Sequence, residues 1–198
     1  MKQQVVVIHG GDTFETYEEY ISFLKKQEVD LEYFRKKRWR DHLQDALGDN
    51  FEVIAPAMPN KWNAKYEEWK IWFEKLFPFL NDDLILIGHS LGGSFVAKYL
   101  SEEKFPKRLK ALLLVAAVYD KDTQAYGLGS FSLPVNLNLQ TDKIYLYHSK
   151  DDFVVPFEDA NKFKEALPGA ELKVFEDRGH FASEEFPEIV EDIKNLEA

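Results

Sequence analysis

One serine of the chain lies in a sequence that suits nucleophilic chemistry. Residues 88–92 are Gly-His-Ser-Leu-Gly and directly follow a short apolar run. In a G-x-S-x-G turn between a strand and a helix, the glycines let the two elements approach closely and the serine hydroxyl stands above the sheet. The start of the helix favours the negative charge that develops during attack on a carbonyl group. The pattern therefore predicts Ser90 as a nucleophile.

A serine hydroxyl needs a base that takes up its proton. The chain has five histidines: His9, His42, His89, His148 and His180. His180 lies in the loop after the last predicted strand, where enzymes with the chain order serine, acid, histidine carry the base. We expect His89, inside the serine turn, to point away from the base, and His148 to be a structural residue at a strand end. The general base is predicted to be His180.

The imidazole needs a carboxylate that fixes its tautomer and stabilises its cation. Aspartates follow two of the predicted strands, Asp120 and Asp122 after one and Asp151 and Asp152 after the other. We favour Asp152, because it begins a turn that leads into a helix and can hold the carboxylate in place. Asp151 and Asp120 remain alternatives.

Two backbone N–H groups are predicted to stabilise the oxyanion of the tetrahedral intermediate. The first is that of Leu91, at the start of the helix after Ser90. The second is expected in the loop His9-Gly10-Gly11-Asp12 after the first strand, at the N–H of Gly11. The H-G-G sequence is the less specific of the two signals, since it also serves ordinary tight turns.

Short apolar runs and helical patterns alternate along the chain and must position these residues. The predicted strands are residues 5–8, 51–55, 84–87, 111–118, 144–147 and 172–175. Helical periodicity fills the segments between them, including residues 17–26 and one long helix over residues 31–47. This alternation predicts a single α/β domain over residues 1–198, with a mainly parallel sheet of about six strands covered on both faces. Ligands of such sheets bind beyond the carboxyl ends of the strands.

Other segments near that edge are predicted to shape the site. Residues 119–141 show no periodicity, so we expect a long loop or a small lid. Trp62, Tyr119 and Phe131 are predicted to line an apolar substrate pocket. The basic residues 35–38, with Arg40, fall on the long predicted helix and are interpreted as a solvated helix face.

The composition limits the class of partner. The chain has 198 residues, with 25 Lys and Arg against 35 Asp and Glu and a formal net charge of −10. Such a chain repels phosphate backbones and anionic lipid, so we expect no nucleic-acid partner and no membrane partner. There is no cysteine, and no apolar run is long enough for a membrane span or a signal-peptide core. We expect a soluble, cytoplasmic protein without a metal or other cofactor.

Four motifs in chain order resemble the α/β-hydrolase superfamily. They are His9-Gly10-Gly11, residues 88–93, residues 148–156 and Gly179-His180-Phe181. The short chain and the segment Ala57-Met58-Pro59-Asn60, followed by Trp69, resemble the YdeN-like and retinoblastoma-binding protein 9-like small serine hydrolases. The resemblance implies Ser90 as nucleophile, Asp152 as acid and His180 as base. It also implies a reduced sheet that lacks the first two strands of the superfamily.

These residues predict a serine hydrolase that cleaves carboxylic esters of small acyl substrates through an acyl-enzyme. An amidase or aminopeptidase with the same triad is one alternative. The other is a member of the fold that mainly binds a protein partner, although no sequence feature indicates such a partner. The expected ligand is a small-molecule ester or amide.

Overall fold

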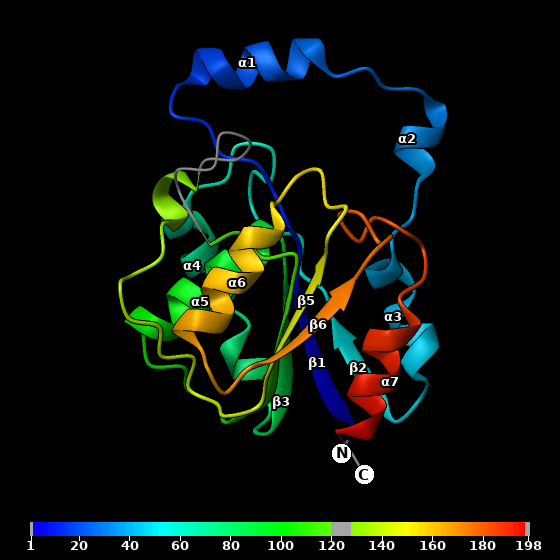
Figure 1. Cartoon of the computed structure of the whole chain (residues 1–198), viewed down its shortest axis with the longest axis vertical. Coiled ribbons are helices and arrows are strands. Elements are labelled where there is room, and N and C mark those ends of the chain that lie inside the picture. Colours follow the sequence, from blue (N-terminus) through cyan, green and yellow to red (C-terminus); the bar gives the residue numbers. More distant parts are fainter. Residues whose placement is uncertain (1, 120–127, 197–198) are drawn as a thin grey trace.

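Six strands form one parallel sheet in the computed structural model, which describes residues 2–119 and 128–196 (Figure 1). The strands are β1 (Gln3–Ile8), β2 (Phe51–Ile54), β3 (Leu84–His89), β4 (Leu109–Val115), β5 (Ile144–Ser149) and β6 (Glu171–Phe175). Their order across the sheet is β2-β1-β3-β4-β5-β6. Every predicted strand is present. The inner strands are runs of mostly apolar residues, and the edge strands β2 and β6 mix such residues with charged ones.

Helices cover both faces of this sheet. α4 (Tyr66–Glu74), α5 (Leu91–Glu102) and α6 (Phe157–Ala166) lie on one face, and α3 (Trp39–Leu47) and α7 (Pro187–Asn195) lie on the other (Figure 1). Short 3-10 helices occupy Phe77–Phe79 and Gly129–Phe131. The predicted fold class is therefore confirmed.

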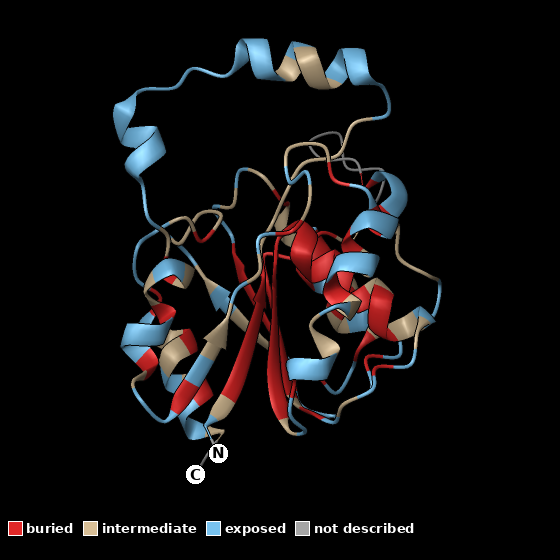
Figure 2. Ribbon diagram, turned by 180° about the vertical axis from the view of Figure 1, so that it is seen from behind, coloured by how far each residue is buried: buried red, intermediate tan, exposed pale blue. Residues whose placement is uncertain are grey.

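An apolar cluster on each face joins the helices to the sheet. Successive residues of β3 alternate between the clusters, since side chains of a strand point to opposite faces. Leu84 and Leu86 pack with α4, α5 and α6, whereas Ile85 and Ile87 pack with α3 and α7. Figure 2 shows the central strands largely buried, as the mainly apolar sequences of β3 and β4 predict, and within these two strands only Lys110 is half-buried.

The segment before α3 differs from the prediction. The expected long helix over residues 31–47 is two helices, α2 (Leu31–Arg35) and α3, with extended backbone at Lys36 and Arg38 between them. α1 (Tyr17–Lys26) and α2 arch above the carboxyl ends of the strands and are largely exposed (Figures 1 and 2). We call residues 16–38 the arm.

The break in the helix has a tertiary cause. Trp39 is buried at the start of α3, and its backbone N–H donates to the carbonyl oxygen of Ser183 at 2.8 Å. α2 stands clear of the core, so the two helices do not share an axis. Phe34 of α2 is 72% exposed, whereas Leu43 and Leu47 of α3 are buried, so only the second part of the expected helix packs on the core.

The predicted lid is described only in part. Residues 120–127, with the alternative acid Asp120, lie outside the described residues. The described remainder packs into the core through Leu128, Phe131 and Leu139. Within the described chain, no helix is both long and apolar enough to cross a bilayer.

Candidate active site

The strand order brings two loops together at one edge of the sheet. The connection from β2 to β3 passes over β1, so the direction of winding reverses there. In open α/β sheets, ligands bind beyond the carboxyl ends of the strands at such a reversal. The register pairs Ile8 of β1 with Gly88 of β3, so the Gly10-Gly11 loop and Ser90 leave the sheet side by side.

Ser90 occupies a strained turn between β3 and α5. Its φ of 55° and ψ of −126° lie in a region that residues other than glycine rarely adopt. The surrounding backbones are very close: a Cβ on Gly92 would lie 2.3 Å from the carbonyl oxygen of Ile8, and a Cβ on Gly88 would lie 2.6 Å from Cα of Gly93. The two glycines of the motif therefore permit the close approach that their pattern predicts.

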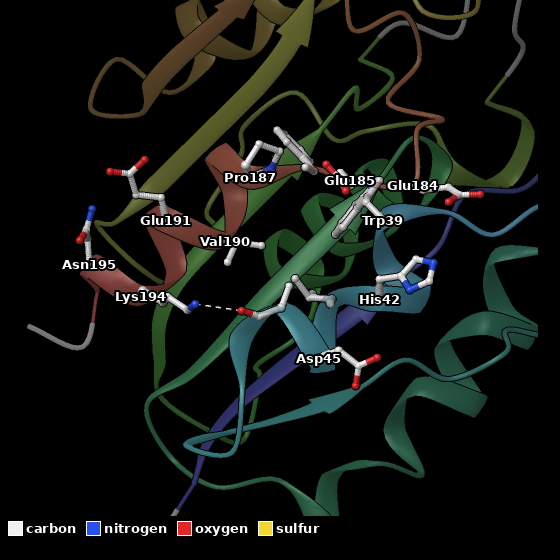
Figure 3. A pocket seen from close by; sticks show the side chains of 13 residues that line it. Trp39, His42, Asp45, Glu184, Glu185, Pro187, Val190, Glu191, Lys194 and Asn195 are labelled. Atoms are coloured by element: carbon white, nitrogen blue, oxygen red, sulfur yellow. Dashed lines mark hydrogen bonds between the residues drawn. The ribbon is translucent and has the colours of Figure 1, made fainter.

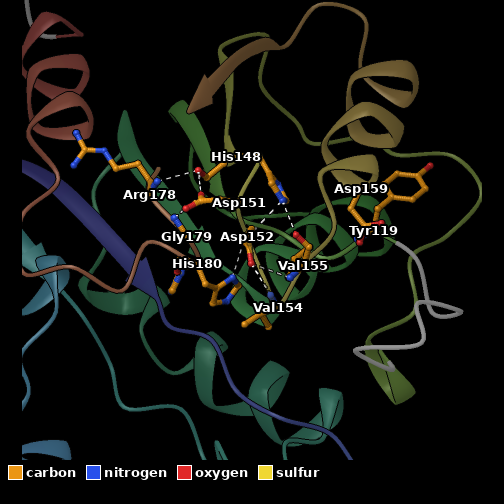
Figure 4. Close-up of polar contacts among 12 residues, drawn as sticks. Tyr119, His148, Asp151, Asp152, Val154, Val155, Asp159, Arg178, Gly179 and His180 are labelled. Atoms are coloured by element: carbon orange, nitrogen blue, oxygen red, sulfur yellow. Dashed lines mark hydrogen bonds and ion pairs between the residues drawn. The ribbon is translucent and has the colours of Figure 1, made fainter. Parts of the chain in front are cut away.

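His180 and Asp152 form a hydrogen-bonded pair (Figure 4). His180 Nδ1 lies 2.8 Å from Asp152 Oδ2. The Asp152 side chain is fully buried, and its Oδ1 accepts the backbone N–H groups of Val154 and Val155 at 2.8 and 2.9 Å. Because an ionised carboxylate only accepts hydrogen bonds, Nδ1 carries the proton and Nε2 is the basic nitrogen of the neutral ring.

Asp151 makes different contacts from its neighbour. Its Oδ1 accepts the hydroxyl of Ser149 at 2.5 Å and the backbone N–H of Gly179 at 2.8 Å. The hydrogen bond from Ser149 holds the pKa of Asp151 below its usual value. Asp151 therefore ties the loop after β5 to the loop after β6, while Asp152 is the aspartate that reaches His180.

His89 does not lie as expected. Its ring centroid is 5.1 Å from that of His180, and its Nε2 donates to the carbonyl oxygen of His180 at 3.1 Å. Trp39 packs edge-on against the same ring, at 6.2 Å between centroids. Burial holds the pKa of His89 well below its usual value, so the ring is neutral. The expectation that His89 points away from the base is wrong, because contacts between segments far apart in sequence fix the ring.

His148 is the structural histidine that its strand-end position predicts. Its buried ring contacts the carbonyl oxygen of Val155 at 2.9 Å through Nε2. Desolvation lowers the pKa of this imidazole. His148 therefore supports the turn whose backbone N–H groups hold Asp152.

His9 holds the loop after β1. Its Nε2 accepts the backbone N–H of Met58 at 2.8 Å, so its Nδ1 carries the proton and donates to the carbonyl oxygen of Gly10 at 2.6 Å. In a trans peptide the C=O and N–H point in opposite directions, so the N–H of Gly11 points away from His9. A Cβ on Gly10 would lie 2.9 Å from Cβ of Ser90, so this loop passes directly beside the serine turn.

A cavity of about 610 Å³ contains Ser90, His180, Gly10 and Gly11 in its wall. Trp62 lines this cavity, whereas Tyr119 and Phe131 do not.

Tyr119 and Phe131 pack elsewhere. Phe131 is fully buried, with its ring 5.2 Å from that of Trp69, and Tyr119 packs on Phe163 at 4.9 Å. Both residues lie outside the strands, but their rings pack in the apolar cluster between the sheet and the helices α4, α5 and α6.

Cationic side chains line the same cavity. Lys36, Arg38 and Arg40, which the sequence interpretation placed on a solvated helix face, contribute to its wall together with Lys61. The interpretation is wrong for Arg38 and Arg40, which are half-buried, because the helix on which it depended is interrupted before Trp39. Asp12 also lines the cavity, and burial raises the pKa of its carboxyl group to about 6.

A second pocket, of about 770 Å³, lies between α3 and α7 (Figure 3). His42 lines it, and Lys194 reaches across it to donate to the carbonyl oxygen of Ala46 at 2.9 Å. None of the predicted catalytic residues contributes to its wall. Pocket volume alone would therefore identify a different site from the one that the strand ends form.

The family model of the serine hydrolases matches residues 32–194. The chain belongs to the serine hydrolase family. This serine hydrolase is similar to serine hydrolase RBBP9 of Rattus norvegicus, with 28% identity over 157 residues that cover 74% of the chain and 78% of the rat protein. YdeN of Bacillus subtilis is 24% identical over 194 residues, which cover 93% of the chain and 89% of that protein.

The fold of this serine hydrolase also matches solved structures. The crystal structure of the ydeN gene product from Bacillus subtilis aligns with a TM-score of 0.77 at 19% identity, over 98% of both chains. The predicted resemblance to the α/β-hydrolase superfamily, and within it to the YdeN-like small serine hydrolases, is confirmed.

Proposed function

We propose that this serine hydrolase cleaves carboxylic esters of small acyl substrates, with Ser90 as nucleophile, His180 as general base and Asp152 as the acid that orients the base. The observation that supports the proposal best is the 2.8 Å hydrogen bond between Asp152 and His180, because His180 lines the cavity that also contains Ser90. The buried carboxylate keeps Nδ1 protonated and therefore leaves Nε2 able to accept the serine proton.

The reaction proceeds in two halves. Ser90 Oγ attacks the ester carbonyl carbon while His180 Nε2 takes up the hydroxyl proton, and the imidazolium then protonates the leaving alkoxide. Water, deprotonated by His180, attacks the acyl-enzyme and releases the carboxylic acid and free Ser90. No step requires a metal or a redox cofactor.

Two backbone N–H groups would hold the oxyanion of each tetrahedral intermediate. Leu91 is the first residue of α5, where an N–H has no intrahelical acceptor. Gly11 would supply the second N–H from the loop that passes beside Ser90, with His9 fixing the orientation of the peptide between Gly10 and Gly11.

Further contacts support the same assignment. His89 and Asp151 both bind the backbone of the loop that carries His180, so they would hold the base at a fixed height above the sheet. The cavity of about 610 Å³ suits a small acyl compound, and Trp62 gives it an apolar wall. A chain without cysteine suits a reducing compartment, and we include a cytoplasmic location in the proposal.

Labelling with a fluorophosphonate probe tests this proposal, because the probe reacts with activated serines whatever the natural substrate. We expect the wild type to be labelled, Ser90→Ala to be unlabelled and His180→Ala to be labelled at least about 10³-fold more slowly. Ser94→Ala is a matched control, since that buried hydroxyl in the same helix donates to the carbonyl oxygen of Val118. A folded wild type that is not labelled, or labelling that survives Ser90→Ala, would overturn the assignment.

Matched substrates distinguish an esterase from an amidase. Phenyl esters and anilides of the same short acyl groups differ only in the leaving group, and we expect the ester of each pair to be the substrate. A higher kcat/KM for the anilides would replace the proposed esterase by an amidase with the same triad.

A further inference from the structure

The cavity around Ser90 has a local charge opposite in sign to that of the whole chain. The chain has a formal net charge of −10, yet the cavity is lined by four cationic side chains, Lys36, Arg38, Arg40 and Lys61, against two carboxyl groups, Asp12 and Asp41. A cleft that concentrates one sign of charge attracts ligands of the opposite sign. The wall of this cavity therefore favours an anionic ligand.

Arg40 differs from Arg38 and Lys61 of this wall in the partners of its side chain. The guanidinium of Arg38 donates to the carbonyl oxygen of Ala182 at 3.1 Å, and the ammonium of Lys61 lies 5.3 Å from the ring centre of Trp62. Arg40 is half-buried, and within residues 2–119 and 128–196 its side chain forms no ion pair or hydrogen bond. Burial lowers the pKa of Arg40, and a charge in that position is stabilised by a counter-ion.

Neither carboxyl group of the cavity forms an ion pair with Arg40, although the nearby charge of Asp41 partly offsets the effect of burial on the pKa of Arg40. Asp41 is exposed and accepts the backbone N–H of Arg38 at 2.7 Å. The pKa of Asp12 is raised to about 6 by burial, and the charge that opposes this rise is that of His180. Asp12 therefore interacts with the proposed base, and Arg40 is left to face the cavity.

The position of Arg40 is set by its neighbour Trp39. Trp39 is buried against His89, and the backbone N–H of Trp39 donates to the carbonyl oxygen of Ser183 in the loop after β6. These two contacts fix the first turn of α3 beside the site. Burial is the main cause of the lowered pKa of His9 and of His89, and the charge of Arg40 lowers both further. Arg40 and Ser90 line the same cavity of about 610 Å³, so one small molecule could contact both the guanidinium and the nucleophile.

We propose that Arg40 binds a carboxylate on the substrate, and that the preferred substrates of this site are esters that carry a carboxylate in addition to the ester group. The proposal rests on the ester hydrolysis proposed above. A guanidinium binds a carboxylate through two parallel hydrogen bonds, which would fix the orientation of the substrate. Tyr33, Phe34 and Trp62 of the same wall would contact the apolar part that joins the two groups.

A matched pair of esters tests the preference. Monoethyl adipate and ethyl hexanoate have the same ester and the same chain length, and differ in a terminal carboxylate in place of a methyl group. We expect the wild type to have the higher kcat/KM for monoethyl adipate. A second pair, para-acetoxybenzoate and its methyl ester, places the carboxylate on the alcohol side and shows which half of the substrate Arg40 contacts.

Arg40→Gln removes the charge and keeps a side chain of similar length. We expect it to lower kcat/KM for monoethyl adipate about 10- to 100-fold, mainly through KM, and to change that for ethyl hexanoate less than about threefold. Arg40→Lys should restore part of the preference. Arg35→Gln, which removes an exposed guanidinium from the arm outside this cavity, should leave both values unchanged.

Protection of Ser90 gives a readout that does not depend on turnover. Adipate should slow fluorophosphonate labelling of the wild type, neutral adipamide should not, and Arg40→Gln should abolish the protection. Absence of Ser90-dependent labelling would defeat the proposed function itself. Labelling at Ser90 without protection by adipate and without preference for the carboxylate esters would defeat only the role of Arg40, as would an equal loss on both esters in Arg40→Gln.

Discussion

Asp152→Asn is expected to abolish most activity without unfolding the protein. In the wild type, Oδ1 of Asp152 accepts two backbone N–H groups, from Val154 and Val155, and Oδ2 accepts Nδ1–H of His180. An asparagine can satisfy the two backbone donors only with its oxygen. Its NH₂ group must therefore face His180 and donate to Nδ1, which places the ring proton on Nε2, the atom that should accept the proton of Ser90.

The magnitude follows from this wrong tautomer. In a serine protease with this triad, the corresponding change lowers kcat about 10⁴-fold, which is about 5.5 kcal/mol of transition-state stabilisation. We expect a loss of about 10³- to 10⁴-fold in kcat here, with little change in KM. The two backbone hydrogen bonds persist but lose the charge of their acceptor, which should cost about 1 to 2 kcal/mol of folding free energy and lower Tm by a few degrees.

Asp151→Asn is the matched control for this experiment. Asp151 binds Ser149 and the backbone N–H of Gly179, so we expect a lower Tm and activity within about tenfold of the wild type. Fluorophosphonate labelling rates and ester hydrolysis, measured on both variants with thermal melts, separate the two roles. Asp152→Asn that is labelled within about tenfold of the wild-type rate, or Asp151→Asn that loses as much activity, would refute the reasoning from hydrogen-bond geometry.

Three further outcomes are expected. Gly10→Ala places a methyl group 2.9 Å from Cβ of Ser90, so labelling should slow about 100-fold or more while the far-UV spectrum stays native, and unchanged labelling would contradict this. The pKa of Asp12 is raised to about 6, so this carboxyl group binds a proton more tightly in the folded protein than in the unfolded chain, and the stability of the protein should fall as pH rises through about 4 to 6. Asp12→Asn should therefore have a higher Tm than the wild type at pH about 8 and an equal Tm at pH about 4. A lower Tm of the variant at pH about 8 would contradict this reasoning. Phe73→Ala removes a fully buried ring that packs against Phe95 and Tyr99 of α5, and it should reduce the free energy of unfolding, measured in urea, by about 3 to 5 kcal/mol. A loss below about 1 kcal/mol would mean that the neighbouring rings fill the space left by Phe73.

The strands and the placing of the site residues along the chain could be predicted because both depend on local sequence. Each strand is a short segment rich in β-branched residues, leucine or aromatic residues between turn residues. Residues that follow parallel strands meet at one edge of the sheet. The choice of Asp152 over Asp151 also had a local basis, since Asp152 begins the turn whose backbone N–H groups it binds.

Contacts between distant segments account for what could not be predicted. Residues 31–47 contain no proline or glycine that would end a helix, and the burial of Trp39 against the loop after β6 accounts for the break. Contacts with Trp39 and with the carbonyl oxygen of His180 fix the orientation of the His89 ring, and both residues are far from His89 in sequence. Phe131 was predicted to lie in a loop at the edge of the sheet that carries the site, but its ring packs against Trp69 in the core.

The basic stretch shows why the overall charge was an incomplete guide to the ligand. A net charge of −10 argues against nucleic acid or a lipid surface as a partner, because such large partners interact with the summed charge of the whole protein. A small ligand inside a cavity meets only the charges within about one Debye length, roughly 10 Å at 0.1 M salt. Arg38 and Arg40 flank the buried Trp39, so its packing brings both cations to the wall beside Ser90. An acidic protein can therefore hold a cationic site, and its substrate should be judged from the residues that line the cavity.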